Sequence, residues 1–254
     1  MKLVQGLQKL NFPQQEIDRL APLMESYIKE LVLFNSAYNL VNTSDHDDIV
    51  VRHILDSLSA WQHIAALAQN RAAALQQSQA GQQSELVIAD IGSGGGLPGI
   101  PLAAALPQFN FVLIERMSKR CAFLQNAAAI LGLKNVVVQN WELEKTPAAS
   151  IDIATFRAFR PLDKKMLKSL LAVLKDGGVL AAYKARRQKI LEEMGALGYS
   201  EQDGASFDLG SPADPRAYKI IALDVPFLTD TNDGDDRERN LVVIKKDSRV
   251  GARE

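Results

Sequence analysis

The sequence has few residues of the kinds that build metal centres and disulfide frameworks. Among 254 residues it contains one cysteine, Cys121, and three histidines, His46, His53 and His63. A single cysteine cannot form an internal disulfide, which indicates a reducing compartment. The histidines show no metal-ligand spacing with one another or with the cysteine. We therefore expect a cytoplasmic protein without a metal ion.

Long apolar runs and a surplus of either charge are also missing. The most apolar stretch, residues 86–106, is interrupted by an aspartate, glycines and two prolines, so it is a poor membrane span. Residues 1–6 have no apolar core of a signal peptide, and we expect none. The net charge of −1 draws neither nucleic acid nor an anionic membrane. If RNA is bound, local basic patches must hold it, and no membrane partner is expected.

The first part of the chain reads as helical. Residues 14–34 repeat apolar side chains at helical spacing, and a second helical pattern follows residues 45–48, whose aspartates suit a helix N-terminus. In the second pattern Arg52 and Asp56 are one turn apart and can form an ion pair. We predict a helical appendage over residues 1–70 and a linker over residues 71–85, which are rich in Ala, Gln and Ser.

From residue 86 onward, short apolar strands alternate with helices. The predicted strands are 86–90, 111–115, 136–139, 151–156 and 179–183, and the predicted helices are 99–106, 118–131, 163–174 and 188–197. Continuous apolar strands that alternate with helices are typical of a parallel sheet covered on both faces.

Two further strands are predicted near residues 218–225 and 240–245. Because no helix separates them, they should form an antiparallel pair at the sheet edge, joined by an exposed acidic loop over residues 226–239. Residues 86–250 thus predict an α/β, Rossmann-like, mostly parallel sheet of seven strands. We expect this domain to form one structural unit with the helical appendage.

The strongest chemical motif is the turn after the first strand, which reads Asp-Ile-Gly-Ser-Gly-Gly-Gly-Leu-Pro-Gly over residues 90–99. In doubly wound sheets a nucleotide-like cofactor lies at this turn, where glycines let the backbone come close. S-adenosylmethionine carries a sulfonium and an ammonium group, which suit an acidic residue such as Asp90. The motif predicts cofactor contacts at Asp90, Gly92, Gly94 and Gly96.

A dinucleotide is the competing cofactor. Residues 94–99 match the pattern G-x-G-x-x-G, although that match begins too far beyond the strand for the first tight turn. Glu115 ends the second strand, where an acidic side chain accepts hydrogen bonds from ribose hydroxyls of either cofactor. An NAD-dependent oxidoreductase therefore stays open at this point.

Two segments resemble one family of enzymes. Arg52-His53-Ile54-Leu55-Asp56-Ser57 and the glycine turn with its extension Leu97-Pro98-Gly99-Ile100-Pro101 are similar to the RsmG (GidB) family. These bacterial methyltransferases use S-adenosylmethionine to methylate N7 of a guanine in 16S ribosomal RNA. The resemblance runs from about Tyr38 to Lys246. It implies a methyltransferase domain, with 16S ribosomal RNA or a precursor of the small ribosomal subunit as partner.

The resemblance also implies site residues. Cofactor contacts would fall on Gly92 and Leu97 in the turn, on Glu142 and Leu143 after the third strand, and on Arg157 after the fourth. The family usually has R-A-E-E where residues 141–144 read W-E-L-E, and Asp at the position of Glu115. It has K-G where residues 184–185 read K-A, and R-H where residues 239–240 read R-N.

The chemistry of N7 methylation agrees with these residues. Guanine N7 has a free lone pair and no proton to lose, so it needs alignment with the methyl group and no base. Residues 156–161 lack the Asn-Pro-Pro-aromatic motif that is typical of amine methylation. Methylation of a pyrimidine carbon needs a cysteine nucleophile on a loop, whereas Cys121 falls inside a predicted helix. Lys184 keeps ribose-oxygen methylation open. Arg157 is predicted as the catalytic residue, because its position suits a cofactor carboxylate or the guanine O6/N7 edge.

Substrate contacts are predicted from the resemblance and from basic residues after strand ends. The set is Asn39, His53, Lys119, Arg120, Lys184, Arg186, Arg187 and Arg239. We expect a monomer. The alternatives are a methyltransferase that acts on another RNA position or substrate, and a non-catalytic RNA-binding factor of ribosome assembly.

Overall fold

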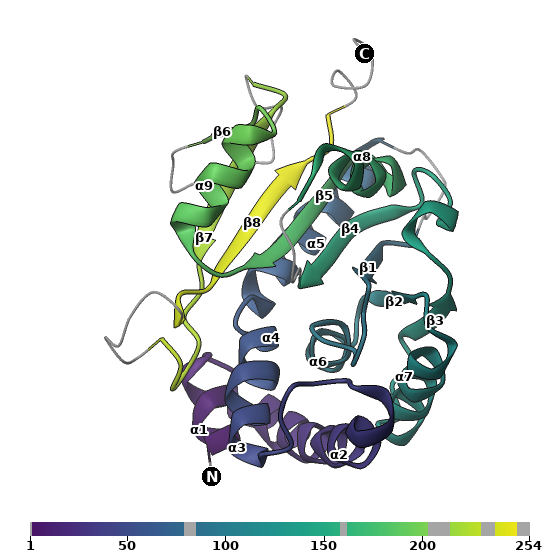
Figure 1. Ribbon diagram of the computed structural model, residues 1–254, viewed down its shortest axis with the longest axis vertical. Coiled ribbons are helices and arrows are strands. Elements are labelled where there is room, and N and C mark those ends of the chain that lie inside the picture. The colour runs from purple at the N-terminus through teal and green to yellow at the C-terminus, as the bar shows by residue number, and fades with distance from the viewer. Residues whose placement is uncertain (1, 79–84, 158–161, 203–213, 230–236, 248–254) are drawn as a thin grey trace.

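The computed structural model describes residues 2–78, 85–157, 162–202, 214–229 and 237–247 (Figure 1). The chain begins with helices only, as predicted. They are α1 (Lys2–Lys9), α2 (Gln14–Tyr38), α3 (His46–Ile49), the π-helix η1 (Val50–Leu55), α4 (Asp56–Leu58) and α5 (Trp61–Ser78). Residues 79–84 of the predicted linker and 230–236 of the predicted acidic loop lie outside the described residues.

A capping aspartate explains where the helical segment that starts with α3 begins, and burial explains which of its side chains faces the sheet. Asp45 precedes α3, and its carboxylate accepts a hydrogen bond from the backbone N–H of Asp48 at 2.8 Å. The predicted ion pair between Arg52 and Asp56 is wrong. Arg52 pairs with Asp48 at 3.4 Å, whereas Asp56 is buried and faces the sheet.

The described residues form an eight-stranded sheet in the order β3-β2-β1-β4-β5-β8-β7-β6. The strands are β1 (Val87–Ile91), β2 (Asn110–Glu115), β3 (Val136–Asn140), β4 (Ile151–Arg157), β5 (Leu174–Lys184), β6 (Ser200–Glu201), β7 (Ala217–Ala222) and β8 (Asn240–Lys245). Strands β1 to β5 pair in parallel, and β8 is antiparallel to both β5 and β7. The α/β fold and the antiparallel pair are confirmed. The eighth strand, β6, is two residues long, which is too short to leave a pattern in the sequence.

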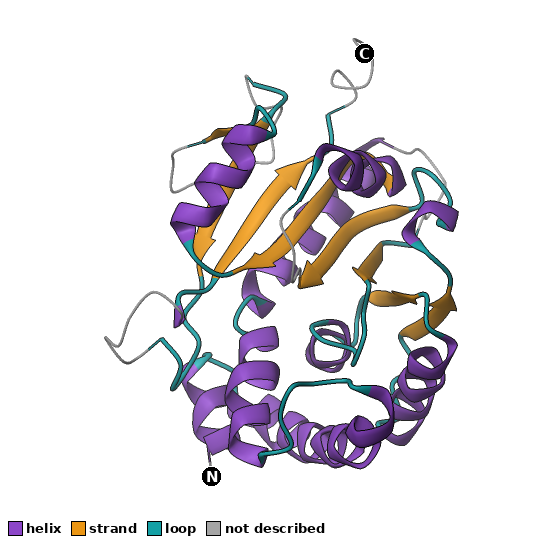
Figure 2. Ribbon diagram, viewed as in Figure 1, coloured by secondary structure: helices purple, strands orange, loops and turns teal. Residues whose placement is uncertain are grey.

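Helices cover both faces of this sheet (Figure 2). Those after β1 are α6 (Gly99–Ala105), α7 (Ser118–Ile130), the 3₁₀ turn η2 (Leu143–Lys145), α8 (Lys164–Val173) and α9 (Arg187–Ala196). Alternate strand residues point to opposite faces. Ile88 therefore joins the core formed with α1 to α7, while its neighbour Ala89 joins the core formed with α8 and α9. The N-terminal helices share one continuous core with the sheet.

The carboxyl ends of β1, β2, β4 and β5 meet at one edge of the sheet. The segment that follows α2, residues 39–45, lies along the same edge beside the turn after β1 (Figure 1). Ligands of open parallel sheets bind at this edge. The fold therefore brings the glycine turn together with residues from the N-terminal helices.

Candidate functional site

The glycine turn after β1 holds its shape through backbone bonds and positive φ angles. The N–H groups of Gly92 and Ser93 both donate to the carbonyl of Ile114 in β2, at 2.8 and 3.1 Å. Gly92, Gly94 and Gly96 have φ of +71°, +56° and +87°, values that favour glycine. A Cβ atom added at Gly92 would meet nothing within 4 Å. The backbone there borders open space that a ligand can fill.

Gly96 differs from Gly92 although both belong to the same motif. A Cβ atom at Gly96 would lie 2.7 to 2.9 Å from atoms of Ile100, Leu124 and Tyr27. Close packing beneath the turn therefore requires this glycine. Leu97 is also buried, at 6% exposure, so its side chain belongs to the core.

Asp90 lies beneath the turn and not on its surface. One carboxylate oxygen, Oδ2, accepts a hydrogen bond from the N–H of Gly99 at 3.0 Å. The other, Oδ1, is buried and has no hydrogen-bond partner among the described residues. Burial raises the pKa of Asp90 to about 7. A positive charge above the turn would stabilise the ionised form of this carboxyl.

Glu115 joins the end of β2 to the glycine turn. Its Oε2 accepts from the N–H of Gly94 at 3.0 Å, and Oε1 accepts from the N–H of Met117 at 2.8 Å. A carboxylate has about four acceptor positions, so it can still accept ribose hydroxyls. The open backbone, the orphaned oxygen of Asp90 and this acceptor together fit S-adenosylmethionine, whose positive charges a pyrophosphate lacks.

Glu142 and Leu143 follow β3 at the same edge of the sheet. Glu142 is exposed and precedes η2, and Leu143 is half-buried against the core of α8 and α9. Both residues lie beyond β2 as seen from the glycine turn, on the side away from Arg157.

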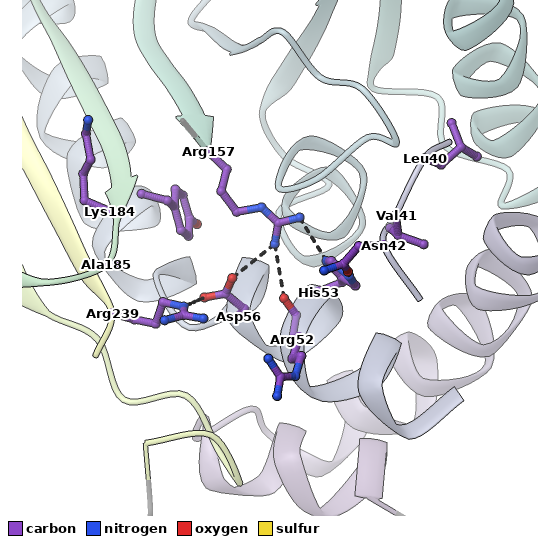
Figure 3. A pocket seen from close by; sticks show the side chains of 11 residues that line it. Leu40, Val41, Asn42, Arg52, His53, Asp56, Arg157, Lys184, Ala185 and Arg239 are labelled. Carbon is purple, nitrogen blue, oxygen red and sulfur yellow. Dashed lines mark hydrogen bonds and ion pairs between the residues drawn. The ribbon is translucent and has the colours of Figure 1, made fainter. Parts of the chain in front are cut away.

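A pocket of about 400 Å³ lies next to the glycine turn (Figure 3). It is lined by Leu40, Val41, Asn42, Arg52, His53, Asp56, Arg157, Tyr183, Lys184, Ala185 and Arg239. Leu40, which lines the pocket, packs against the turn, because a Cβ atom at Gly95 would lie 3.1 Å from the carbonyl oxygen of Leu40. The hydroxyl of Tyr27 in α2 also donates to the carbonyl of Gly95. The wall of the pocket and the glycine turn therefore border each other at Leu40 and Gly95.

Asn35 holds the pocket segment that follows α2. Its Oδ1 accepts from the N–H groups of Leu40 and Val41, both at 2.9 Å, and its amide donates to the carbonyl of Thr43 at 3.2 Å. Nothing in the sequence analysis predicted this role. A single asparagine near the end of a helix forms no sequence pattern that predicts hydrogen bonds to residues five to eight positions later.

Arg157 lies in the middle of the pocket and binds three groups of the N-terminal helices (Figure 3). Its Nη1 donates to Asp56 Oδ2 at 3.1 Å and to the carbonyl of Arg52 at 3.4 Å, and Nη2 donates to His53 Nδ1 at 3.2 Å. The guanidinium is therefore oriented by partners about one hundred residues away in the sequence.

His53 is neutral in this network. Burial, followed by the charges of Arg157 and Arg52, lowers the pKa of His53 to about 3. Because Nδ1 accepts from Arg157, the ring proton resides on Nε2, which donates to Asn42 Oδ1 at 3.3 Å. The imidazole therefore cannot take up a proton near neutral pH.

Asp56 lies between two arginines at the base of the pocket. The residue is 4% exposed, and Arg239 Nε approaches Oδ1 to 3.4 Å as an ion pair without a hydrogen bond. Burial raises the pKa of Asp56, and the two arginines oppose that shift. Asp56 was not among the site residues predicted from the sequence. The segment Arg52–Ser57, which carried the family resemblance, was the available indication.

The other predicted substrate residues do not form one basic surface. Lys184 lines the pocket, but its side chain points away and pairs with Glu193 at 2.6 Å (Figure 3). Arg187 pairs with Glu201 at 2.8 Å, and Arg120 donates to the carbonyl of Asn39 at 3.0 Å. Lys119 is exposed and Arg186 is half-buried. Only His53, Arg157, Lys184 and Arg239 meet at the pocket.

Among the residues that the structure describes, no helix is long and apolar enough to cross a membrane. No group of three His, Cys, Asp or Glu residues among them could hold a metal ion.

Comparison with known proteins gives consistent results. Residues 21–197 match the family model described as rRNA small subunit methyltransferase G. The ribosomal RNA small subunit methyltransferase G of Treponema denticola is 38% identical over 258 residues, which cover 96% of this chain and 93% of that protein. The enzyme of the same name from Treponema pallidum is 36% identical, over 82% of this chain and 86% of that protein. The enzyme of that name from Neisseria meningitidis serogroup B is 34% identical, over 87% of this chain and 86% of that protein.

Proposed function

The chain belongs to the rRNA small subunit methyltransferase G family, and from this premise we propose how its site methylates N7 of a guanine in 16S ribosomal RNA. The enzyme is an S-adenosylmethionine-dependent methyltransferase. The observation that carries the proposal is that Leu40, which lines the arginine-containing pocket, packs against Gly95 of the glycine turn. The cofactor would lie over the turn and the guanine would enter the pocket beside it.

The turn supplies the cofactor site. S-adenosylmethionine, when bound, supplies an electrophilic methyl group. The backbone at Gly92 and Gly94 would lie against it, Glu115 would accept its ribose hydroxyls, and Asp90 would balance its positive charge from below. Glu142 and Leu143 are proposed on the adenine side, at the end of β3. Gly96 and Leu97 support the turn by packing.

The pocket supplies orientation without a base. Guanine N7 loses no proton when it is methylated, so the site must only align the ring with the methyl group. His53 cannot accept a proton near neutral pH, and Lys184 is held in an ion pair with Glu193. Arg157 offers N–H donors that suit guanine O6 or a phosphate. This combination favours N7 over a ribose oxygen, which would need a base.

The proposal extends to the RNA partner of the enzyme. We propose 16S ribosomal RNA or a precursor of the small subunit, met by a monomeric enzyme in the cytoplasm, where such particles assemble. Exposed Arg116 and Lys119, next to the carboxyl end of β2, would contact phosphates near the site.

Two measurements test the proposed function. Calorimetric titration should show binding of S-adenosylhomocysteine and none of NADH. Mass spectrometry of nucleosides from 16S ribosomal RNA should show 7-methylguanosine in cells with the protein and its loss in cells without it. Binding of NADH, or an unchanged 7-methylguanosine content, would contradict the proposal.

A further inference from the structure

Among the described residues that line the pocket, Asp56 is the one buried carboxylate, and neither the cofactor nor the methyl transfer requires it directly. It lies in α4, while its two cationic partners come from the sheet: Arg157 is the last residue of β4, and Arg239 directly precedes β8. Strand β5 separates those two strands in the sheet. The carboxylate thus links three elements around one pocket.

We propose that Asp56 is a positioning residue, whose carboxylate holds Arg157 and Arg239 on the wall of the pocket so that they can bind the RNA. The proposal rests on the proposed function. Two guanidinium groups at one pocket repel each other, and an anion between them removes much of that repulsion. Without the carboxylate, Arg157 would lose its charged partner, and Arg239 would lose the anion that it approaches in the pocket.

The hydrogen bonds of Arg157 show what this orientation leaves available. Nη1 donates both of its hydrogens, one to Asp56 and one to the carbonyl of Arg52, and Nη2 donates one of its two to His53. The Nε–H and the second Nη2 hydrogen have no partner among the described residues. They are the donors that can bind an oxygen of the RNA, either a charged phosphate oxygen or the carbonyl oxygen O6 of guanine.

A second carboxylate shows what a purely structural role looks like in this chain. Asp152 is fully buried and also holds two cations, Arg71 at 3.0 Å and Lys175 at 2.7 Å. The N–H of Val87 donates to it as well, at 3.1 Å, so both oxygens have hydrogen bonds. Asp56 instead leaves Oδ1 without a hydrogen bond and borders a pocket. Buried carboxylates that only support a fold are normally satisfied.

The test compares Asp56→Asn with the matched control Asp152→Asn. For Asp56→Asn we expect the KM for 16S ribosomal RNA to rise about tenfold and kcat to fall, the loss of one well-oriented charged contact. The affinity for S-adenosylhomocysteine should stay within about twofold. Asp152→Asn should lower the melting temperature while KM and kcat stay within about twofold of the wild type.

Coupling to the arginines separates positioning from a direct effect. In an Arg157→Ala/Arg239→Ala background, Asp56→Asn should change the KM for RNA by less than about twofold, because the residues it positions are gone. A full additional effect in that background would overturn the proposal. So would an unchanged KM in the single variant, or an equal rise in Asp152→Asn.

Arg239→Gln covers the case in which Asp56→Asn does not fold, because it leaves the bond between Asp56 and Arg157 intact. Its KM for RNA should rise while cofactor affinity is kept, and an unchanged KM would overturn the proposal. If the wild type itself methylates no RNA, the proposed function fails together with this inference. An active wild type with unaffected variants contradicts the inference alone.

Discussion

The two ends of β4 carry similar clusters with different surroundings. Near its start, Asp152 holds Arg71 of α5 and Lys175 of β5, and every carboxylate oxygen is hydrogen-bonded. At its end, Arg157 is held by Asp56, and one oxygen of that carboxylate lacks a hydrogen bond. Ligands of open parallel sheets bind at the carboxyl ends of strands. The amino end can therefore be satisfied by the protein alone, while the carboxyl end keeps donors available.

The largest difference between the two ends of β4 should be seen in the activity of variants of their arginines, Arg157 and Arg71. We expect Arg157→Ala to lower kcat/KM for RNA methylation by about ten- to a hundredfold, the value of a charge-assisted contact in the transition state. The melting temperature should also fall, because Asp56 then keeps, among the described residues, the longer ion pair with Arg239 alone. Steady-state kinetics and thermal unfolding measure both.

Arg71→Ala is the control at the other end of the strand. It should lower the melting temperature and leave kcat/KM unchanged, since Arg71 meets only Asp152 among the described carboxylates. A loss of activity in Arg71→Ala equal to that in Arg157→Ala would remove the distinction between the two ends.

The glycine turn repeats the contrast between packing and ligand positions. Gly96→Val should destabilise the protein, because its side chain would press on Ile100, Leu124 and Tyr27, at a cost of about 1–3 kcal/mol from overpacking. Gly92→Ala meets only the strain of positive φ, about 1–2 kcal/mol. It should stay folded and lose affinity for S-adenosylhomocysteine. Normal affinity in folded Gly92→Ala would show that the cofactor does not use that space.

A smaller effect concerns pH. The pKa of Asp90 is raised from its ordinary 3.8 to about 7, so its contribution favours the fold at low pH and is lost as the pH rises through about 7. A cationic cofactor favours the ionised carboxylate. The thermal stabilisation by S-adenosylmethionine should therefore grow between pH 6 and pH 8, a range of about one unit on either side of that pKa. Asp90→Asn should abolish this pH dependence, and an unchanged dependence would assign it to another group.

The smallest expected effect is on the salt dependence of RNA binding, which should differ between variants of an exposed cation and of a paired one. Lys119→Ala should flatten the logarithmic salt dependence of RNA binding by about 0.7, the value for one phosphate contact to a single strand. Arg187→Ala should change it less, because Arg187 already pairs with Glu201. RNA affinity measured over a salt series compares them, and equal slopes in both variants and the wild type would place the RNA elsewhere.

Local patterns predicted most of the fold. Apolar strands, glycine turns and aspartate caps act over a few residues, so the order of β1 to β5 and the place of the cofactor turn could be predicted. The pairing of Asp56 could not. Helical spacing favoured Arg52 as its partner, whereas the chain forms a π-helix there and buries Asp56 against residues 101 and more positions away. The burial of Asp90 and the packing need of Gly96 likewise depend on helices distant in sequence.

If the proposed function is right, this site methylates guanine N7 in 16S ribosomal RNA through Arg157 and not through a base. The direct measurement incubates purified protein with 16S ribosomal RNA and S-adenosylmethionine labelled in its methyl group, followed by nucleoside analysis. We expect label in 7-methylguanosine alone, formed by the wild type and reduced about ten- to a hundredfold in folded Arg157→Ala. Label in a ribose or in another base, or full transfer by folded Arg157→Ala, would contradict it.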